Sequence, residues 1–365
     1  MSSFEEQVSG SSSSSSSRSI SGATKLYYGE ILKTTDDLQT NACCTDEAPK
    51  PEVRAALSNL SDLVLSKYYG CGLVYPEAIE GKTILDLGCG AGRDVFVLSQ
   101  LVGEHGKVIG VDFTEAQLAT AKSEADAHMK KFKYKQSNVD FLLADIQDLS
   151  SIATNSIDIV VSNCVVNLAR DKRAVLKEAN RVLKQGGEFY FSDVYSTRRL
   201  SIALREDKEL WGECLSGALY WNDFDRLAKE CGFLDPRLIK SRRLTVNNKR
   251  LEEKLGGQTE FYSATYRLFN LSQLEPDCED YGQAVVYKGT VVNQAHAFVL
   301  DGHHTIETGK MFPVCGNTWS MLKDTRFCDH FTFHGDMTRH YGIFDGCGKG
   351  VPFSQDGGVA TSSCC

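Results

Sequence analysis

Four cysteine positions in this chain lie where a thiol could meet a ligand. Cys164 follows the apolar run IDIVVSN, which predicts a buried parallel strand, so its thiol comes at the carboxyl end of that strand. Open α/β sheets bind ligands at that end. Cys71 in KYYGCGLVYPE and Cys214 in LWGECLSGA lie among glycines in loop-like sequence, and Cys43 lies in DLQTNACC. Burial as a small apolar residue explains many cysteines, but it explains Cys71 and Cys214 less well.

The cysteine count narrows the chemistry further. The 365 residues include 13 cysteines, an odd number, and no secretory signal precedes them, so a disulfide framework is not expected. In a reducing compartment the remaining explanations are binding of a soft metal or metalloid, redox chemistry, and burial. Cys89, inside a glycine loop, and Cys231, on an amphipathic helix, fit burial well.

A glycine loop carries the second chemical pattern. In ILDLGCGAGRD, Gly88, Gly90 and Gly92 match G-x-G-x-G between a strand and a helix. Without a Cβ atom the backbone can turn sharply and approach a ligand closely. A dinucleotide enzyme would favour G-x-G-x-x-G, and the carboxylate of Asp86, just before the loop, would repel a pyrophosphate. A cationic or amino-bearing ligand suits this loop better.

Acidic residues also follow the next two predicted strands. Asp112 can accept both hydroxyls of a ribose, Phe113 can pack on an adenine, and Asp145 lies within reach of the adenine amino group. We assign Ile146 to the same site. Turn glycines and helix-capping acids would explain any one of these features alone. Together they resemble the class I S-adenosylmethionine-dependent methyltransferases.

These residues need a parallel sheet to bring them together. Strands are predicted at 82–88, 107–113, 139–145, 157–163 and 188–195, alternating with helices at 92–102, 114–132 and 171–184. Thr114 is the expected N-cap of its helix, and residues 185–187 are an expected turn. This order predicts an α/β fold with a doubly wound, Rossmann-like parallel sheet.

The flanking regions are less regular. Residues 27–75 have a helical pattern with breaks at Gly29, at Pro49 and Pro51, and at Gly70. After the last parallel strand we expect a helix and loop at 203–221, a helix at 222–233, and strands at 237–246 and 260–271. The second of these strands should run antiparallel at the sheet edge. Beyond residue 274 the chain is rich in glycine and β-like.

Composition excludes several classes of partner. The net charge of −8 and the pI near 5.6 argue against a nucleic-acid surface. The hydrophobic fraction is 42%, and we expect no membrane span and no membrane partner. The Ser-rich start has no apolar signal segment, and Glu5 and Glu6 weaken a transit-peptide interpretation. A cytoplasmic protein, acting as a monomer, is expected.

At the level of longer motifs, the chain is similar to the arsenite methyltransferase family. The similarity extends from about residue 27 to 271 and is carried by DLQTNAC, YYGCGLV, ILDLG, VVSNCV, FSDVY and LWGECL. It implies that Cys164 and Cys214 hold trivalent arsenic and that Cys43 and Cys71 complete the thiol set, in substrate capture and reductive disulfide chemistry. Cys71 would be the third arsenic ligand. Cys44 adjoins Cys43, and the spacing from DLQTN favours Cys43.

The same similarity implies S-adenosyl-L-methionine as methyl donor and a thiol reductant, glutathione or thioredoxin, as co-substrate. Tyr69 is a candidate to contact the sulfonium, and Trp211 shares a helical face with Cys214, although simple packing explains Trp211 equally well. Glu213 could order water, but a carboxylate disfavours a neighbouring thiolate.

The chemistry is consistent with that family. Trivalent arsenic is soft and takes three thiolates, which leaves it a lone pair that can attack a sulfonium methyl in line. No proton leaves such a nucleophile, so no general base and no metal cofactor is required. Two other functions stay open at this point. One is a methyltransferase for a sterol or quinone carbon or oxygen atom, and the other is a non-catalytic arsenic or zinc sensor on the same fold.

This interpretation divides the chain into five parts. They are a disordered Ser-rich start at 1–24, a methyltransferase domain with an N-terminal helical segment at 25–195, an arsenic-binding lobe with edge strands at 196–274, a C-terminal domain at 275–350, and a flexible tail at 351–365. The C-terminal domain has histidines and cysteines without zinc-finger spacing, so we expect a small β-rich domain with exposed histidines. We expect no catalytic role for Cys364 and Cys365 in the tail.

Overall fold

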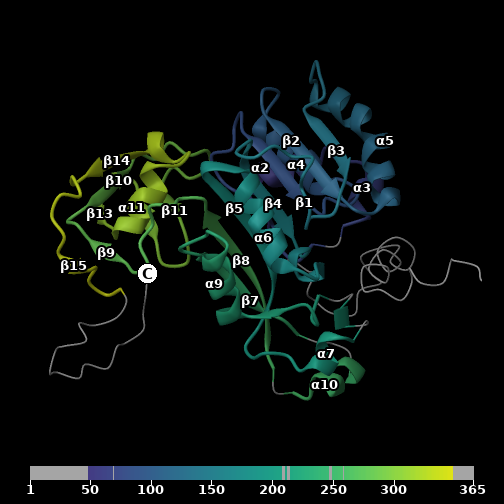
Figure 1. The fold of residues 1–365 in the computed structure, drawn as a ribbon. Coiled ribbons are helices and arrows are strands. Elements are labelled where there is room, and N and C mark those ends of the chain that lie inside the picture. The colour runs from purple at the N-terminus through teal and green to yellow at the C-terminus, as the bar shows by residue number, and fades with distance from the viewer. Residues whose placement is uncertain are drawn as a thin grey trace, which may run out of the picture.

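The predicted parallel sheet forms the centre of the molecule. A computed structural model describes residues 48–68, 70–207, 210–211, 214–245, 249–257 and 259–347. The sheet strands are β1 (Thr83–Leu87), β2 (Lys107–Asp112), β3 (Val139–Leu143), β4 (Ile157–Asn163), β5 (Leu183–Ser196), β6 (Leu219–Tyr220), β7 (Arg237–Arg243) and β8 (Phe261–Phe269). Their order is β3-β2-β1-β4-β5-β8-β7, and β6 pairs with β5 (Figure 1). The chain reverses its direction of travel across the sheet between β1 and β4, where such folds bind ligands.

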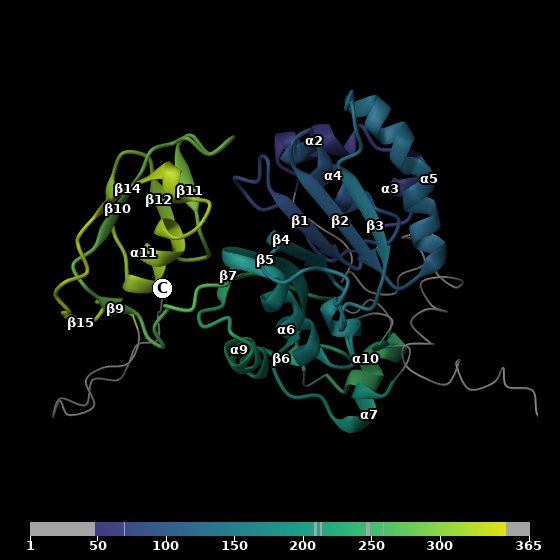
Figure 2. The same cartoon turned by 45° about the horizontal axis from the view of Figure 1, so that its top comes forward.

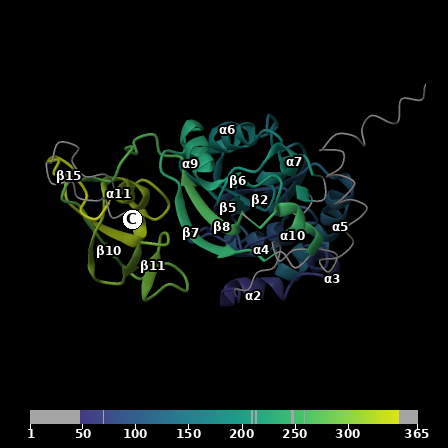
Figure 3. The same ribbon diagram turned by 90° about the horizontal axis from the view of Figure 1, so that it is seen from below.

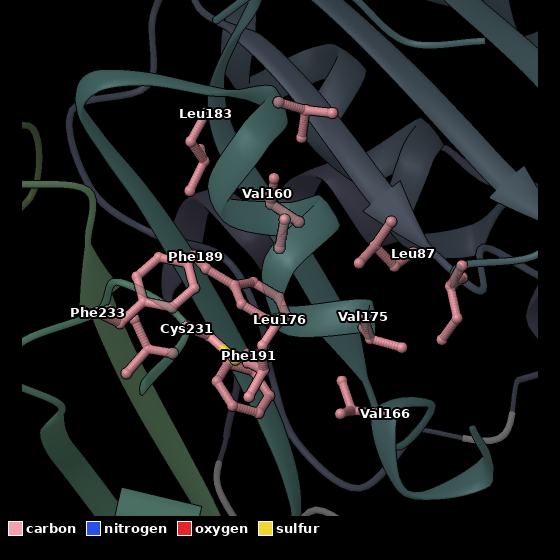
Figure 4. Packing of buried hydrophobic residues seen from close by; sticks show 14 of the residues in the cluster. Leu87, Val160, Val166, Val175, Leu176, Leu183, Phe189, Phe191, Cys231 and Phe233 are labelled. Carbon is pink, nitrogen blue, oxygen red and sulfur yellow. The ribbon is translucent and has the colours of Figure 1, made fainter. Parts of the chain in front are cut away.

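Helices cover both faces of this sheet. On one face α2 (Pro51–Leu57), α4 (Arg93–Val102) and α5 (Glu115–Phe132) bury residues such as Phe96 and Leu118. On the other face α6 (Lys172–Val182) and α9 (Trp221–Glu230) pack on β5. Figure 4 shows Leu176 beside Phe189 and Phe191, and Val175 belongs to the same buried cluster. The doubly wound α/β prediction is therefore confirmed.

Two cysteines lie in these cores as small apolar residues. Cys231 is in the cluster of Figure 4, and Cys89 is in the core on the opposite face. Both are buried, as the sequence predicted for them. Burial in an apolar core is therefore enough to explain these two cysteines, and a chemically active cysteine must show more than burial.

The sheet edge differs from the prediction. Strand β8 is antiparallel to β5, as expected, but it lies between β5 and β7, and β7 is the edge. Most of β8 is buried, whereas β7, with the sequence RLIKSRR, is largely part-exposed and rich in charge. Charged side chains are typical of an edge, where they discourage pairing with another chain.

Two turn predictions also need correction. Pro51 begins α2 as its first residue instead of breaking a helix, and this position costs nothing because the first turn needs no N–H donor there. The expected turn at 185–187 lies within β5, because α6 already ends at Val182. Gly186 has a φ of 75° and donates its N–H to Asn270 O, so the chain turns while it keeps its pairing.

Two short helices lie together at one end of the sheet. Figures 1 and 2 show α7 (Ile202–Arg205) beside α10 (Lys249–Leu255), and Lys254 Nζ lies 2.8 Å from a carboxylate oxygen of Asp207. The remaining short helix of this half, α3 (Asp62–Leu65), packs near α5. In the described part of the chain no helix is long and apolar enough to cross a bilayer.

The C-terminal residues form a separate small β-rich unit beside the sheet (Figure 3). Its elements are β9 (Glu279–Asp280), β10 (Ala284–Tyr287), β11 (Ala297–Val299), β12 (Thr305–Glu307), β13 (Met311–Pro313), α11 (Gly316–Lys323), η6 (Cys328–His330), β14 (Phe331–His334) and β15 (Gly342–Ile343). It has its own apolar core, which includes Phe298 and Phe327. The expectation of exposed histidines is wrong for His304, which is buried. The Nδ1 atom of His304 pairs with Asp301, and this hydrogen bond compensates for the loss of water. The domain boundaries themselves stay a prediction.

A buried ionic cluster joins this unit to the sheet. Glu188 of β5 is fully buried between Arg267 of β8 and Arg326 of the C-terminal unit. Arg267 also lies 2.9 Å from Glu77. Burial alone would raise the pKa of Glu77, but Arg267 and Lys50 lower it to about 2. Removing one member of such a cluster leaves a buried charge unpaired. The junction between the sheet and the C-terminal unit therefore depends on all the charged residues of the cluster.

Candidate active site

A cavity of about 140 Å³ opens at the carboxyl ends of β1, β2 and β4. The residues assigned to the cofactor from sequence line it, apart from Tyr69, which lies outside the described residues: Asp86, Gly88, Gly90, Asp112, Phe113, Asp145 and Ile146. Cys164 lines the same cavity. One hollow therefore brings together the glycine loop, the strand-end acids and a candidate arsenic ligand.

The glycine loop has the geometry that its sequence predicts. Gly88 has a φ of 73°, and a Cβ atom there would lie 2.5 Å from the Val165 side chain, so no larger residue fits. Gly90 has a φ of 52°, and nothing lies within 4 Å of where its Cβ would be. Its N–H donates to Asp112 Oδ2 over 2.9 Å. The loop is thus held against β2 with its open side toward the cavity.

Asp112 has a structural role as well as its predicted ligand role. Its Oδ1 accepts the N–H of Thr114 over 2.8 Å, while the Thr114 side chain makes no capping hydrogen bond to the helix. Burial raises the pKa of Asp112, and the backbone donors oppose that shift. Each carboxylate oxygen keeps a second lone pair for a hydroxyl donor. Capping and ligand binding are compatible at this residue.

Asp86 has the environment of a carboxylate that pairs with a cationic ligand. Its side chain is 2% exposed, and its Oδ2 has no hydrogen-bond partner. Burial raises the pKa of Asp86 well above its ordinary value, and the nearby carboxylates of Asp94 and Asp112 raise it further. A buried carboxylate oxygen without a donor is costly. A ligand ammonium or sulfonium at this point would supply the missing positive charge.

Asp145 lies at the exposed end of the cavity. Strand β3 ends at Leu143, two residues earlier than predicted. Asp145 Oδ1 accepts the backbone N–H of Gln147 and the Gln147 side chain also donates to the carboxylate. The carboxylate is therefore positioned by its own turn, with Ile146 buried beside it.

Asn163 and Tyr68 are site residues that the sequence did not identify. Asn163, the last residue of β4, accepts the N–H of Gly72 and donates to Gly72 O, to the Tyr68 hydroxyl and to Asp94 Oδ2. The guanidinium of Arg93 lies 3.4 Å from the centre of the Tyr68 ring. These bonds fix the segment around Cys71 against the end of β4. The only signal in the sequence was the position of Asn163 beside Cys164.

Three predicted cysteines meet next to the cavity. Cys71 and Cys164 form a disulfide with Cα atoms 5.6 Å apart, although 93 residues separate them in sequence. The Cys214 thiol donates to Cys164 O over 3.4 Å. In this form neither Cys71 nor Cys164 offers a thiolate, which differs from the expected open thiol set. The structure shows Cys71 and Cys164 in their oxidised, disulfide-bonded form.

Unusual backbone geometry marks two of the three cysteines that the family resemblance gives as arsenic ligands. Cys164 has a φ of 59° and Cys214 a φ of 61°, in the left-handed region that residues with a Cβ seldom adopt. Such strain persists only where surrounding contacts impose it, and it occurs most often at functional sites. The N–H of Cys164 bonds to Ser192 O, and that of Cys214 bonds to Trp211 O.

The surroundings of the three cysteines are apolar. They share one buried cluster with Val194, Leu210, Leu215, Ala218, Leu244, Leu255 and Phe261. Each of the three thiol side chains is at most 3% exposed. A dry site of this kind favours a neutral, thiophilic ligand and shields it from water.

A mostly buried ammonium group lies near this cluster. Lys172 Nζ donates to Asn167 O over 3.1 Å and to Ala169 O over 3.0 Å, in the segment after Cys164. It also lies 5.5 Å from the centre of the Trp211 ring, in the segment before Cys214. Burial lowers the pKa of Lys172 to about 8, while Asp193 and Cys214 oppose that shift. Lys172 is therefore mostly a cation at neutral pH, and it interacts electrostatically with Cys214.

Comparison with known proteins decides the family. A model of a methyltransferase domain matches residues 79–232, and a model of the arsenite methyltransferase C-terminal domain matches residues 281–350. An arsenite methyltransferase of Aquipseudomonas alcaligenes is 54% identical over 342 residues, 93% of this chain and 98% of the relative. The chain belongs to the arsenite methyltransferase family. The arsenite methyltransferase of Homo sapiens is 46% identical over 312 residues, 84% of this chain and 82% of the relative.

A solved structure extends this match to the fold. The crystal structure of an arsenic(III) S-adenosylmethionine methyltransferase from Chlamydomonas reinhardtii has a TM-score of 0.79 and 49% identity, and covers 82% of this chain and all of that chain. The family, the enzyme class and the methyltransferase fold predicted from the sequence are therefore confirmed. The match also supports S-adenosylmethionine as the ligand of the glycine-loop cavity.

Several predicted residues of this arsenite methyltransferase family member cannot be placed. Cys43, Cys44, Tyr69, Glu213, Cys364 and Cys365 lie outside the described residues. Their roles stay predictions, as does the choice between Cys43 and Cys44. The described residues contain no group of three or more His, Cys, Asp or Glu side chains that could hold a metal ion.

Proposed function

We propose that this chain transfers methyl groups from S-adenosylmethionine to thiolate-bound trivalent arsenic, which gives methylated arsenicals. One observation carries the proposal: Cys164 lines the acidic cavity and, on its other side, joins the buried cluster of Cys71 and Cys214. Cys164 is therefore the point of contact between a methyl donor and a thiophilic acceptor.

The residues of the cavity fit the donor. Asp86 would face its positively charged end, and Asp112 and Asp145 would accept hydrogen bonds from its ribose and adenine, with Phe113 and Ile146 on the adenine faces. S-adenosylmethionine supplies an electrophilic methyl group on a sulfonium. The orphaned oxygen of Asp86 is the feature of this chain that favours a cation over a neutral nucleotide.

The acceptor site must first be reduced. Two reductant thiols convert the Cys71–Cys164 disulfide into two cysteine thiols and leave as the reductant disulfide. Arsenous acid then exchanges three hydroxyl groups for the thiols of Cys71, Cys164 and Cys214 and releases three waters. Arsenic so held keeps its lone pair, and the position of Cys164 directs that lone pair toward the cavity. Holding the two reactants together removes on the order of 7–11 kcal/mol from the barrier.

Electron balance gives the disulfide a place in the cycle. When the arsenic lone pair forms the new bond to the methyl carbon, the bond from that carbon to the sulfonium breaks, the donor leaves as a neutral thioether, and arsenic becomes pentavalent. Its return to the trivalent state takes two electrons. Two of the three bound cysteine thiolates supply them as their bonds to arsenic break and they form a disulfide, and the methylated arsenic on the third thiolate takes a hydroxyl group from water, which releases a proton. The Cys71–Cys164 bond is suited to be that product, and glutathione or thioredoxin would reopen it. We propose that this reductant, and not a metal cofactor, is the second requirement for turnover.

Lys172 has the position of a residue that stabilises thiolate charge. It interacts electrostatically with Cys214, donates to Asn167 O and Ala169 O in the segment after Cys164, and lies 5.5 Å from the centre of the Trp211 ring in the segment before Cys214. A nearby cation favours the thiolate over the thiol. Lys172 is thus proposed as a positioning residue, while the cysteines themselves bind the substrate.

The proposal is tested with purified, reduced protein, arsenite and donor labelled in the methyl group. We expect label in methylated arsenicals, separated by chromatography. Label that enters a sterol or quinone but not arsenite would favour a carbon or oxygen methyltransferase, and arsenite binding without transfer would favour a sensor. The number of methyl groups in the main product is read from the same chromatogram.

We propose a cytoplasmic monomer that uses neither a nucleic-acid nor a membrane partner. The acidic net charge of −8 supports the first exclusion. Sedimentation of the reduced protein at 40.3 kDa would support the monomer, and a mass of twice that value would contradict it.

A further inference from the structure

The C-terminal unit contains a second pair of cysteines, far from the first in sequence. Cys315 is fully buried at the N-cap of α11, where its sulfur accepts the Thr318 N–H over 3.5 Å and lies 3.3 Å from Thr318 Oγ1. Cys278 precedes β9 and is half-buried. The segment before it is held against α11, because Asn317 accepts the N–H of Glu275 and donates to Glu275 O. The two side chains interact, and that of Cys278 is the more exposed.

A buried cation accompanies this pair. Arg237 Nη2 lies 4.0 Å from the Cys315 sulfur, and the Arg237 side chain is 5% exposed. The same guanidinium pairs with Asp235 over 2.7 Å and with Asp301 over 3.1 Å. Asp301 is in turn held by His304. Arg237 therefore remains charge-balanced whether or not the neighbouring sulfur carries a charge.

These contacts favour one thiolate and one thiol. The interaction with Cys278 and the charge of Arg237 lower the pKa of Cys315 to about 5 against the effect of burial. The pKa of Cys278 is raised, because Cys278 shares its proton with Cys315. At neutral pH the pair holds a nucleophilic sulfur and a thiol that can bind the same atom.

We propose that Cys278 and Cys315 form a second arsenical site, which takes a trivalent arsenical that carries one methyl group. Among the described residues no third His, Cys, Asp or Glu completes a ligand set here. Two sulfurs match the two exchangeable positions of methylarsonous acid, whereas inorganic arsenite needs three and a dimethylated arsenical uses one. One thiol, one thiolate and one proton replace two hydroxyl groups, and two waters leave.

This inference rests on the proposed function only for the supply of its ligand. The catalytic site would release a monomethylated arsenical, and the C-terminal pair would then retain it on the same chain. The site in the C-terminal unit would thus hold back an intermediate between methylations. Its chemistry needs no methyl donor and no residue of the cavity.

The test measures arsenic bound per chain by elemental mass spectrometry after reduced protein is mixed with methylarsonous acid and desalted. The protein is the full chain with Cys71, Cys164 and Cys214 changed to serine, which silences the first site. We expect Cys278→Ser in this background to lower the arsenic content by one atom per chain. Cys328→Ser, a change at a half-buried cysteine of the same unit, should not lower it. Equal arsenic content in both variants would overturn the proposal.

A second measurement avoids substitutions in the C-terminal unit. The wild-type chain is treated with methylarsonous acid and then with N-ethylmaleimide, and modification of each cysteine is read by peptide mass spectrometry. We expect Cys278 to become protected and Cys328 to react as before. Unchanged labelling of Cys278 would contradict the site. Because neither readout uses methyl transfer, an inactive enzyme that still protects Cys278 would overturn the proposed function and leave this site standing.

Discussion

The cofactor cavity and the cysteine cluster meet at Cys164, yet they are built in opposite ways. The acidic groups of the cavity lie at or just beyond the carboxyl ends of β1, β2 and β3, and Oδ2 of the buried Asp86 has no hydrogen-bond partner. The cluster draws on segments at 71, 164 and 214, is lined by apolar side chains, and has the cation Lys172 beside it. The cavity is thus suited to a cationic methyl donor, and the cluster is suited to an acceptor that binds to cysteine thiolates.

This difference has a functional consequence. The two reactants carry different charge and polarity, so each site rejects the ligand of the other. Among the described residues, Cys164 is a buried member of the cluster that also lines the cavity, and Leu168 packs against the cluster and lines the cavity as well. Changes in one region should therefore leave ligand binding in the other nearly unchanged, and each prediction below tests that separation.

Oxidation should have the largest effect. Protein in which the Cys71–Cys164 disulfide is intact should bind no arsenite at the catalytic cluster, because two of its three ligands are blocked. The same protein should bind S-adenosylmethionine with unchanged affinity. Calorimetric titration of oxidised and reduced protein with each ligand checks both statements. Loss of donor binding on oxidation would show that the regions are not separate.

Asp86→Asn should weaken donor binding by roughly 100-fold, because it removes a buried charge that faces the donor cation. Asp145→Asn is the matched control, and its exposed position predicts a loss of at most about tenfold. Arsenite binding should be the same in both variants. The measurement is the Kd for S-adenosylmethionine, and equal effects of the two substitutions would contradict the special role of Asp86.

Lys172→Met should lower kcat about tenfold, with little change in KM for the donor, because the cation beside Cys214 is lost. In the wild type, the rate should fall as pH rises through about 8, where Lys172 loses its proton. Asp193, Arg205 and Asp171 are the other charged groups that face it. The variant should lack this alkaline fall. Lys177→Met, an exposed change on α6, should keep the wild-type profile.

Asn163→Ala should have the smallest effect on chemistry and a moderate one on stability. It removes four hydrogen bonds that tie the Cys71 segment to β4 and to Asp94. We expect a loss of about 1–3 kcal/mol in the free energy of unfolding. Urea denaturation followed by circular dichroism measures it. An unchanged denaturation midpoint would show that this segment is held by other contacts.

The sequence predicted what local pattern determines. The strand–helix alternation, the loop of Gly88 and Gly90, and the position of Asp86 all follow from neighbouring residues. It could not predict that β8 lies between β5 and β7, because the order in which strands pair depends on burial in the assembled sheet. Confusing the edge strand with its neighbour left the functional prediction intact, since both lie away from the cavity.

Long-range contacts account for what was missed at the site. Asn163, Tyr68 and Lys172 gained their roles from partners that only the fold brings near. The pairing of Cys71 with Cys164 joins segments 93 residues apart, and sequence spacing does not specify such a partner. The approach of Cys278 to Cys315 likewise follows from the fold and not from sequence spacing.

The central claim is that Cys164 and Cys214 hold arsenic for methyl transfer, and one assay tests it most directly. Label transfer from S-adenosylmethionine to arsenite is measured for the wild type, for Cys164→Ser and Cys214→Ser, and for Cys231→Ser as a buried cysteine outside the cluster. We predict transfer in the wild type and in Cys231→Ser, and a loss of roughly 100-fold or more in each of the other two variants, because proximity to the methyl group is lost. Full transfer by Cys164→Ser or Cys214→Ser, with donor binding intact, would contradict the account.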